Sequence, residues 1–253
     1  MSGAHLFDLD GRVAIVTGAS SGLGAAVARA LAGLGARVAL VARRADRLAE
    51  LAKEIDGAAV PCDLSDPAGI AAIVPAVADA LGSPEILINA AGNRFSTARA
   101  EFETPDEIRR TVELNLLAPL FLAQQVFPRM RATGRGAIVN VSSISGRVGM
   151  PGIPQASYAA SKAGLSGLTT ELAVQWARHR IRVNTVAPGF FRSEITDSLY
   201  DSARGSEYLR RNIPLPEQAT AQDMVGAIVW LAGDAASYVT GQTIVVDGGW
   251  TAR

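Results

Sequence analysis

A tyrosine and a lysine four residues apart, Tyr158 and Lys162, are the residues of this sequence best suited to proton transfer. On a helix the two side chains would lie on one face, a turn apart. The pKa of a phenol is normally near ~10, and a protonated amine beside it favours the phenolate and lowers that pKa. The pair therefore predicts a tyrosine that can donate and accept a proton. The same spacing also occurs on ordinary surface helices, so the rest of the chain must decide.

The elements that would position this pair begin with a glycine-rich turn. A short apolar strand, from Val13 to Val16, leads into glycines at positions 18, 22 and 24, and a helix follows to about Leu34. Glycines at this point of a βαβ unit permit a tight turn and let backbone N–H groups approach a pyrophosphate. Such turns can be purely structural, but a position between the first strand and the first helix favours a dinucleotide site.

The rest of the chain continues the alternation of strands and helices. We expect strands over residues 38–42, 58–62, 85–89, 137–141, 181–186 and 242–246. We expect helices over residues 45–55, 67–81, 105–133, 157–178 and 220–231. This order indicates an α/β fold with a parallel, doubly wound sheet of about seven strands and helices on both faces. We therefore predict a single Rossmann-type domain over residues 1–253, with the polar segment 193–212 as a substrate lid within it.

The composition argues against several classes of function. The formal net charge is zero and no basic run is present, so nucleic acid and anionic membranes are not expected partners. Cys62 is the only cysteine, which excludes an internal disulfide and indicates a reducing compartment. His5 and His179 have no ligand cluster near them in the sequence, so no metal is expected. Residues 1–10 lack the features of a signal peptide and no apolar run approaches ~20 residues, so we expect a cytoplasmic protein.

The glycine turn and the Tyr158–Lys162 pair belong to a set of motifs that resembles the short-chain dehydrogenase/reductase family. In chain order the motifs are residues 17–24 (TGxxxGxG), 89–92 (NNAG), 140–146 (NxSSxxG), 158–162 (YxxxK), 188–189 (PG) and 247–249 (DGG). Ala90 replaces the second asparagine of NNAG, and the resemblance runs from about residue 9 to residue 250. It implies an oxidoreductase that moves a hydride between a nicotinamide cofactor and a carbonyl or secondary-alcohol carbon of a small molecule.

The resemblance implies a role for three polar side chains. Tyr158 would be the general acid/base, and Lys162 would lower its pKa and hold the nicotinamide ribose. Ser143 would hydrogen-bond the substrate oxygen as charge develops there. The gap to Tyr158 is two residues longer than is usual in the family, so a plain count lands on Ser145 instead. Alignment on Gly146 favours Ser143 and leaves Ser145 as the alternative, and the Ser143 hydroxyl could also simply satisfy a local backbone group.

Asn115 matches the fourth catalytic residue of the family, and a backbone argument stands beside that match. Pro119 has no N–H to donate to the carbonyl of Asn115, four residues earlier, so this carbonyl is left free inside the expected helix. A water bound there and reaching towards Lys162 would serve as a proton relay. An ordinary proline kink would leave the same carbonyl free without any function.

The end of the second strand indicates which cofactor is bound. NAD-binding chains place an acidic residue there for the ribose hydroxyls, but this chain has Ala42 followed by Arg43. Unless Arg43 is merely a solvated charge, it would hold a 2′-phosphate, so we expect NADP(H) rather than NAD. Ser21 weakens this case, because NADP-binding relatives often carry a basic residue in the glycine turn. The residues expected around the cofactor are Gly18, Ser20, Ser21, Gly22, Leu23, Gly24, Arg43, Asp63, Leu64, Asn89, Ala91, Gly92, Tyr158, Lys162, Pro188, Gly189, Phe191 and Ser193.

The sequence leaves the substrate open. Residues 188–193 and 247–250 resemble gluconate 5-dehydrogenases, the core motifs equally resemble 3-oxoacyl-acyl-carrier-protein reductases, and a broad ketone reductase is a third possibility. A member of a different class, a non-catalytic dinucleotide sensor, would usually have lost Tyr158 or Lys162. The side chains that could meet a substrate are apolar or cationic: Phe95, Met150, Ile153, Phe190, Tyr200, Arg94, Arg147 and Arg192.

Small residues on the helix of Tyr158 bear on assembly. Ala160, Gly164 and Gly167 form a stripe along it, and each glycine within a helix costs ~1 kcal/mol relative to alanine. Close approach of another helix would supply a reason for them. Members of the family dimerise through this helix and the one before it, so we expect a homotetramer assembled through the helices that carry Asn115 and Tyr158.

Overall fold

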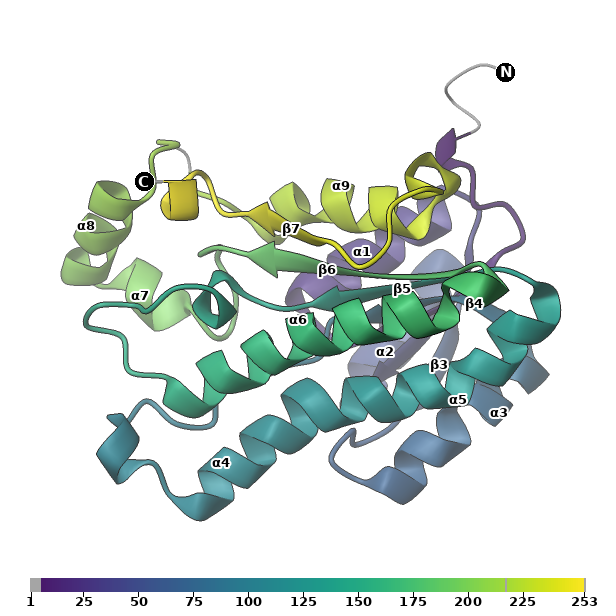
Figure 1. The fold of residues 1–253 in the computed structure, drawn as a ribbon, viewed down its shortest axis with the longest axis horizontal. Helices are drawn as coiled ribbons and strands as arrows, with labels where there is room; N and C mark the ends of the chain where they lie inside the picture. Colours follow the sequence, from purple (N-terminus) through teal and green to yellow (C-terminus); the bar gives the residue numbers. More distant parts are fainter. Residues whose placement is uncertain (1–5, 217, 253) are drawn as a thin grey trace.

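One parallel β-sheet with helices on both faces forms the framework of the protein (Figure 1). A computed structural model describes residues 6–216 and 218–252. Its strands lie in the order β3-β2-β1-β4-β5-β6-β7, and all neighbouring strands are parallel. This confirms the predicted doubly wound α/β fold with seven strands.

The predicted elements agree with the structure to within about two residues at each end, apart from the middle of the 105–133 helix. The strands are β1 (Val13–Thr17), β2 (Arg37–Ala42), β3 (Ala58–Pro61), β4 (Pro84–Asn89), β5 (Gly136–Val141), β6 (Ile181–Pro188) and β7 (Thr243–Val246). The helices are α1 (Gly22–Gly33), α2 (Ala45–Ile55), α3 (Pro67–Leu81), α4 (Pro105–Val112), α5 (Ala118–Thr133), α6 (Ala156–Trp176), α7 (Asp197–Asp201), α8 (Ala203–Asn212) and α9 (Ala221–Ala232).

The central strands are apolar throughout because helices cover both faces of the sheet. Every residue of β1 and of β5 is buried, as expected for strands without a solvent-facing side. One core cluster packs α1, α2 and α9 on one face and includes Leu31 and Ile228. The other packs α3, α5 and α6 on the opposite face and includes Ile73, Leu122 and Trp176. The two cores fix the helices, and with them the loops that leave the carboxyl ends of the strands.

The order of the strands reverses between β1 and β4. β1 pairs with β2 on one side and with β4 on the other, and ligands of such sheets bind outside the carboxyl ends of strands at this switch point. The loops that follow β1 and β4 touch each other here. Gly18 has φ +69°, and a Cβ added to it would lie 2.9 Å from the backbone of Ala91. Both the backbone conformation and the close approach therefore require glycine at this position.

The helical segment from residue 105 to residue 133 contains a π-helical turn. Residues 113–117 form this turn, in which the N–H of Ala118 donates to the carbonyl of Glu113, five residues earlier. Pro119 consequently lies in the first turn of α5. The disturbance expected around Asn115 is present, but it takes the form of an extra residue in one turn instead of a proline kink.

A buried ladder of polar side chains connects α6 with the middle of the sheet. Asn89 Nδ2 donates to Asn140 Oδ1 at 2.8 Å, and Asn140 Nδ2 donates to Thr169 Oγ1 at 2.9 Å. The hydroxyls of Thr169 and Thr185 lie 2.7 Å apart. All four side chains are almost completely buried, so their polar groups cannot bond to water and depend on one another as hydrogen-bond partners. The ladder holds α6 in register with β4, β5 and β6.

Replacing Thr169 with valine preserves the shape of the side chain and removes the hydroxyl that Asn140 donates to. We expect the free energy of unfolding to fall by about 1–3 kcal/mol, because a buried amide loses its partner. Thr170 is the matched control: it is exposed and bonded to the carbonyl of Ser166, so Thr170→Val should cost less than about 0.5 kcal/mol. Urea unfolding of both variants measures the difference, and equal losses would contradict a structural role for the ladder.

Candidate active site

A cleft of about 810 Å³ opens at the carboxyl ends of the strands, at the switch point between β1 and β4. The loops after β1, β2, β3, β4, β5 and β6 all contribute to its walls, so residues far apart in the sequence meet there. The sequence-predicted residues that line it are Gly18, Ser20, Ser21, Gly22, Leu23, Gly24, Arg43, Asp63, Leu64, Ala91, Gly92, Ser143, Tyr158, Lys162, Pro188, Gly189, Phe191 and Ser193.

Two predicted residues lie behind the wall of the cleft. Asn89 is 2% exposed, and its amide belongs to the buried ladder that joins β4 to β5. Its side chain therefore has a structural role, and the cofactor contact expected of Asn89 stays a prediction. Asn115 is fully buried: its Oδ1 accepts from the N–H of Asn93 at 2.9 Å, and its Nδ2 donates to the carbonyl of Asn93, also at 2.9 Å. Asn115 thus fixes the loop after β4 instead of entering the cleft.

The glycine-rich turn leaves a cradle that fits a dinucleotide. A Cβ added to Gly24 would lie 2.4 Å from the carbonyl oxygen of Gly18. Helix α1 can therefore begin this close to β1 only because residue 24 has no side chain. The first N–H groups of α1 then face the cleft, where an anion is stabilised.

At the edge of the cleft Asp63 accepts hydrogen bonds from the backbone N–H and from the hydroxyl of Ser65. These bonds, the backbone one above all, lower the pKa of the Asp63 carboxyl and keep it charged.

Arg44, which is not among the predicted site residues, lies across this turn. Its Nε donates to Ser20 Oγ at 3.0 Å, and an Nη atom donates to Ser21 Oγ at 2.5 Å. Arg43, a predicted cofactor residue, is exposed and lines the same cleft. Arg44 therefore brings to the glycine turn the positive charge that Ser21 itself lacks. Its place beside Arg43 was the available signal in the sequence.

Tyr158 stands at the start of a short chain of polar groups. Its hydroxyl is hydrogen-bonded to Ser143, and Ser143 Oγ in turn accepts from the N–H of Ser145 and donates to Ser145 Oγ, both at 3.1 Å. Gln155 Nε2 donates to Ser145 Oγ at 2.9 Å. Of the two serines, Ser143 is the one bonded to the phenol, and Ser145 is held one step further away.

Lys162 lies behind Tyr158 and is 3% exposed. Its Nζ is 5.8 Å from the centre of the Tyr158 ring and donates to the carbonyl of Val141 at 2.8 Å. A Cβ on Gly92 would lie 3.0 Å from this Nζ, so the loop after β4 closes directly onto the amine. Burial lowers the pKa of Lys162 to about 8.

The pKa of Tyr158 shifts in the direction opposite to the one expected from the Lys162 charge. Burial is the largest influence and raises this pKa, while the hydrogen bond with Ser143 and the charge of Arg94 lower it in part. The spacing of Tyr158 and Lys162 predicted only the effect of the charged amine on the pKa of the phenol. In the structure the burial of the phenol has the larger effect on this pKa. The phenol is therefore in its protonated form at neutral pH.

Comparisons with known proteins agree with this arrangement. The family model for enoyl-(acyl carrier protein) reductase matches residues 18–251. D-threitol dehydrogenase of Mycolicibacterium smegmatis is 37% identical over 98% of this chain and 95% of its own length. The 3-oxoacyl-[acyl-carrier-protein] reductase of Rickettsia conorii is 37% identical over 96% of this chain and 98% of its own. The chain belongs to the short-chain dehydrogenase/reductase family. It is accordingly an oxidoreductase that acts on alcohol or carbonyl groups.

A solved member of this family has nearly the same fold. The gluconate 5-dehydrogenase of Burkholderia cenocepacia J2315, crystallised with NADP and tartrate, has a TM-score of 0.93 and 32% identity, and the match covers 99% of both chains. The similarity therefore includes segment 193–212 and the chain beyond it.

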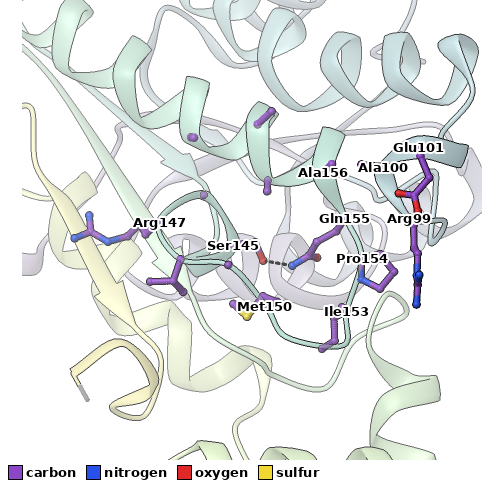
Figure 2. A pocket seen from close by; sticks show the side chains of 16 residues that line it. Arg99, Ala100, Glu101, Ser145, Arg147, Met150, Ile153, Pro154, Gln155 and Ala156 are labelled. Atoms are coloured by element: carbon purple, nitrogen blue, oxygen red, sulfur yellow. Dashed lines mark hydrogen bonds between the residues drawn. The ribbon is translucent and has the colours of Figure 1, made fainter.

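Beside the cleft this dehydrogenase/reductase has a second, shallower pocket of about 620 Å³ (Figure 2). The hydrogen bond between Gln155 and Ser145 lies in the middle of the view, with Met150 and Ile153 on the loop below it. Arg147 lines this pocket and points away from that bond. Ser145, Ile153 and Gln155 line both hollows, so the Gln155–Ser145 bond is part of the partition between them.

The segment 193–212, predicted as a lid, contains the two short helices α7 and α8. Tyr208 on α8 donates from its hydroxyl to the carbonyl of Pro151 at 3.1 Å, which connects the segment with the loop before α6. Arg192 forms ion pairs with Asp197 and Asp201, and Tyr200 is buried, so neither residue lines the cleft as a substrate contact.

Nothing within residues 6–216 and 218–252 resembles a metal site: no group of three or more His, Cys, Asp or Glu side chains could hold an ion. In the same part of the chain no helix is long and apolar enough to cross a membrane.

The buried amine of this oxidoreductase can be tested directly, because Lys162 and Lys53 are the only lysines. In protein labelled with ¹³C-lysine, we expect the Cε signal of Lys162 to titrate with a midpoint of about 8. Lys53→Arg identifies the second signal. Since the folded pKa is below the unfolded value of ~10.4, the unfolded chain binds more protons between these values. The contribution of Lys162 to stability should therefore rise from pH about 8 to ~10.4 and level off above that. A midpoint above ~10 would contradict the burial of the amine.

Proposed function

We propose that the protein transfers a hydride between NADP(H) and a carbonyl or secondary-alcohol carbon, with Tyr158 as the general acid/base. The observation that carries the proposal is the meeting of Tyr158 and Ser143 in one cleft, with the buried amine of Lys162 behind them. A non-catalytic dinucleotide sensor would need the cradle and none of these three groups. Their juxtaposition therefore favours catalysis.

Each side chain has a distinct task in this proposal. Ser143 and Tyr158 hold the substrate oxygen between two hydroxyls, which stabilise the negative charge that develops on it. Tyr158 gives this oxygen a proton during reduction and removes the proton from the alcohol during oxidation. When bound, the nicotinamide supplies or accepts the hydride at the neighbouring carbon. Ser145 keeps Ser143 in place and is the alternative anchor.

Lys162 is proposed to act on both the cofactor and the phenol. Its ammonium group has three N–H donors, and one of them is used by the carbonyl of Val141. The others are available to ribose hydroxyls. Below its pKa of about 8 the amine is charged, and in a cleft emptied of water by its ligands this charge favours the phenolate of Tyr158.

Asn115 is proposed to contribute through position. Its amide holds both backbone groups of Asn93 and donates to Ser161 Oγ at 3.1 Å, one residue before Lys162. The π-helical turn at residues 113–117 is where the water of the predicted proton relay would bind, within reach of the same helix α6.

The choice of NADP(H) is supported by charge at the end of β2. Arg43 and Arg44 both line the cleft after Ala42, and no carboxylate stands at position 42 to repel a phosphate. Guanidinium groups bind phosphates through paired hydrogen bonds. The gluconate 5-dehydrogenase of B. cenocepacia J2315, solved with NADP, provides a similar example.

For the substrate we favour a small sugar acid. Arg94 lines the cleft close enough to act electrostatically on Tyr158, which suits a carboxylate on the substrate. The similar gluconate 5-dehydrogenase was crystallised with tartrate, an organic acid. The alternative, a 3-oxoacyl-acyl-carrier-protein reductase, is supported by the R. conorii relative and by the apolar side chains of Phe95, Ile153 and Phe190 in the cleft. A small ketone would need only these apolar contacts.

We further propose a cytoplasmic homotetramer assembled through the helices that carry Asn115 and Tyr158. The single cysteine supports the location. The small-residue stripe supports the assembly in part: Ala160 and Gly167 are exposed, whereas Gly164 faces Leu116 of the same chain, whose Cδ2 would lie 3.1 Å from an added Cβ. Gly164 therefore already has a packing reason within one subunit.

Tyr158→Phe should lower kcat by about a hundred-fold or more, since it removes the proton donor and leaves the ring in place. An NADPH-oxidation screen over sugar acids, β-ketoacyl thioesters and simple ketones identifies the substrate for this assay. Tyr238→Phe, at a fully exposed position, is the control and should retain activity. Near-wild-type turnover of Tyr158→Phe would remove the acid/base assignment. In the same assay Ser143→Ala should cost more than Ser145→Ala.

Arg43→Asp should reverse the preference for NADPH over NADH by about ten-fold or more, because a carboxylate there repels the 2′-phosphate and accepts from ribose hydroxyls. Arg37→Asp is the matched charge reversal, since Arg37 begins the same strand at its opposite end. Dissociation constants from nicotinamide fluorescence measure both variants. Tighter binding of NADH than NADPH by the wild type would overturn the cofactor choice.

A further inference from the structure

A carboxylate of the lid segment, Glu194, is bound to two arginines at the edge of the cofactor cleft. Its Oε1 accepts from Arg44 Nη1 at 3.0 Å and from Arg47 Nη1 at 3.2 Å. The same Arg44 holds Ser20 and Ser21 of the glycine-rich turn. Glu194 thereby ties the beginning of the lid to the turn after β1 and to helix α2, which carries Arg47.

Arg44, which Glu194 engages, is also placed to bind a 2′-phosphate together with Arg43. Arg44 and Glu194 both line the cleft, next to Arg43. The hydrogen bond from Arg44 is the largest of the influences that lower the pKa of the Glu194 carboxyl, so this group is negatively charged at neutral pH. A carboxylate and a phosphate use the same donors of a guanidinium, and two anions at one site repel each other.

We propose that Glu194 is a cofactor-specificity residue that occupies Arg44 and Arg47 until a 2′-phosphate displaces it. The proposal rests on the NADP(H) dependence proposed above. In this arrangement NADP(H) must release Glu194 in order to bind Arg44, and this release frees the first residues of the lid. NAD(H) has no group that competes with Glu194, so it leaves the lid attached at this point.

The size of the effect follows from solvent exposure. The side chains of Arg44, Arg47 and Glu194 are 38%, 48% and 60% exposed, so the ion pairs are screened and weak. With an internal competitor, the apparent dissociation constant equals the intrinsic one divided by the fraction of molecules in which the site is free. Removing its charge should therefore improve the binding of a 2′-phosphate by roughly two- to five-fold.

The test compares 2′,5′-ADP with 5′-AMP, which differ only in the 2′-phosphate. Isothermal titration calorimetry of Glu194→Gln should show 2′,5′-ADP binding roughly two- to five-fold more tightly than to the wild type, with the affinity for 5′-AMP unchanged. Glu207→Gln is the matched control. Glu207 is a carboxylate of α8 that pairs with Arg210, so its loss should change neither affinity.

Two other outcomes have distinct meanings. If Glu194→Gln binds 2′,5′-ADP no more tightly than the wild type does, Glu194 is not a competitor and the inference falls. If the wild type binds 5′-AMP as tightly as 2′,5′-ADP, the NADP(H) dependence itself is refuted, and the inference falls with it.

Limited trypsin digestion provides a readout that is independent of affinity. Cleavage of the wild type after the exposed Arg204 of α8 should become faster with 2′,5′-ADP and stay unchanged with 5′-AMP. In Glu194→Gln, cleavage should be fast without any ligand. A wild-type rate that does not respond to 2′,5′-ADP would overturn the release of the lid.

Discussion

The burial of one charged amine is the constraint on which the rest of the site depends. Lys162 is almost completely enclosed, so its ammonium group needs fixed partners in place of water. The carbonyl of Val141 at the end of β5 is one partner, and it can reach the amine only because α6 packs tightly on that strand. A Cβ on Gly146 would lie 2.6 Å from the N–H nitrogen of Ala163, so this contact requires glycine in the β5–α6 loop. Burial lowers the pKa of Lys162 and raises that of Tyr158, so the loss of water disfavours the charged form of each group.

Features that depend on local order could be predicted from the sequence. The unbroken apolar runs of β1 and β5 indicate buried parallel strands, and the glycines at 18 and 24 fit a turn whose geometry excludes side chains. The disturbance at Asn115 follows from the missing N–H of Pro119, although its π-helical form does not, because a proline can be accommodated in several ways.

Features that depend on tertiary contacts could not be predicted in this way. Arg44 reaches Ser21 across 23 residues, and nothing in the local sequence separates it from a solvated charge. Asn89 matches a motif that suggests a cofactor contact, yet its partner is Asn140, on the neighbouring strand and 51 residues away. The pKa of Tyr158 depends on how much water surrounds the ring, a quantity that the Tyr–Lys spacing does not contain.

The loop between Ser143 and Tyr158 touches segment 193–212. In the structure this loop carries Pro151, whose carbonyl accepts from the hydroxyl of Tyr208 on α8. The same loop presents Ile153 to the cleft, while Gln155 at its end holds Ser145. The loop therefore contributes both to the wall of the cleft and to the contact with segment 193–212. A change in either segment should consequently move the contacts of the other.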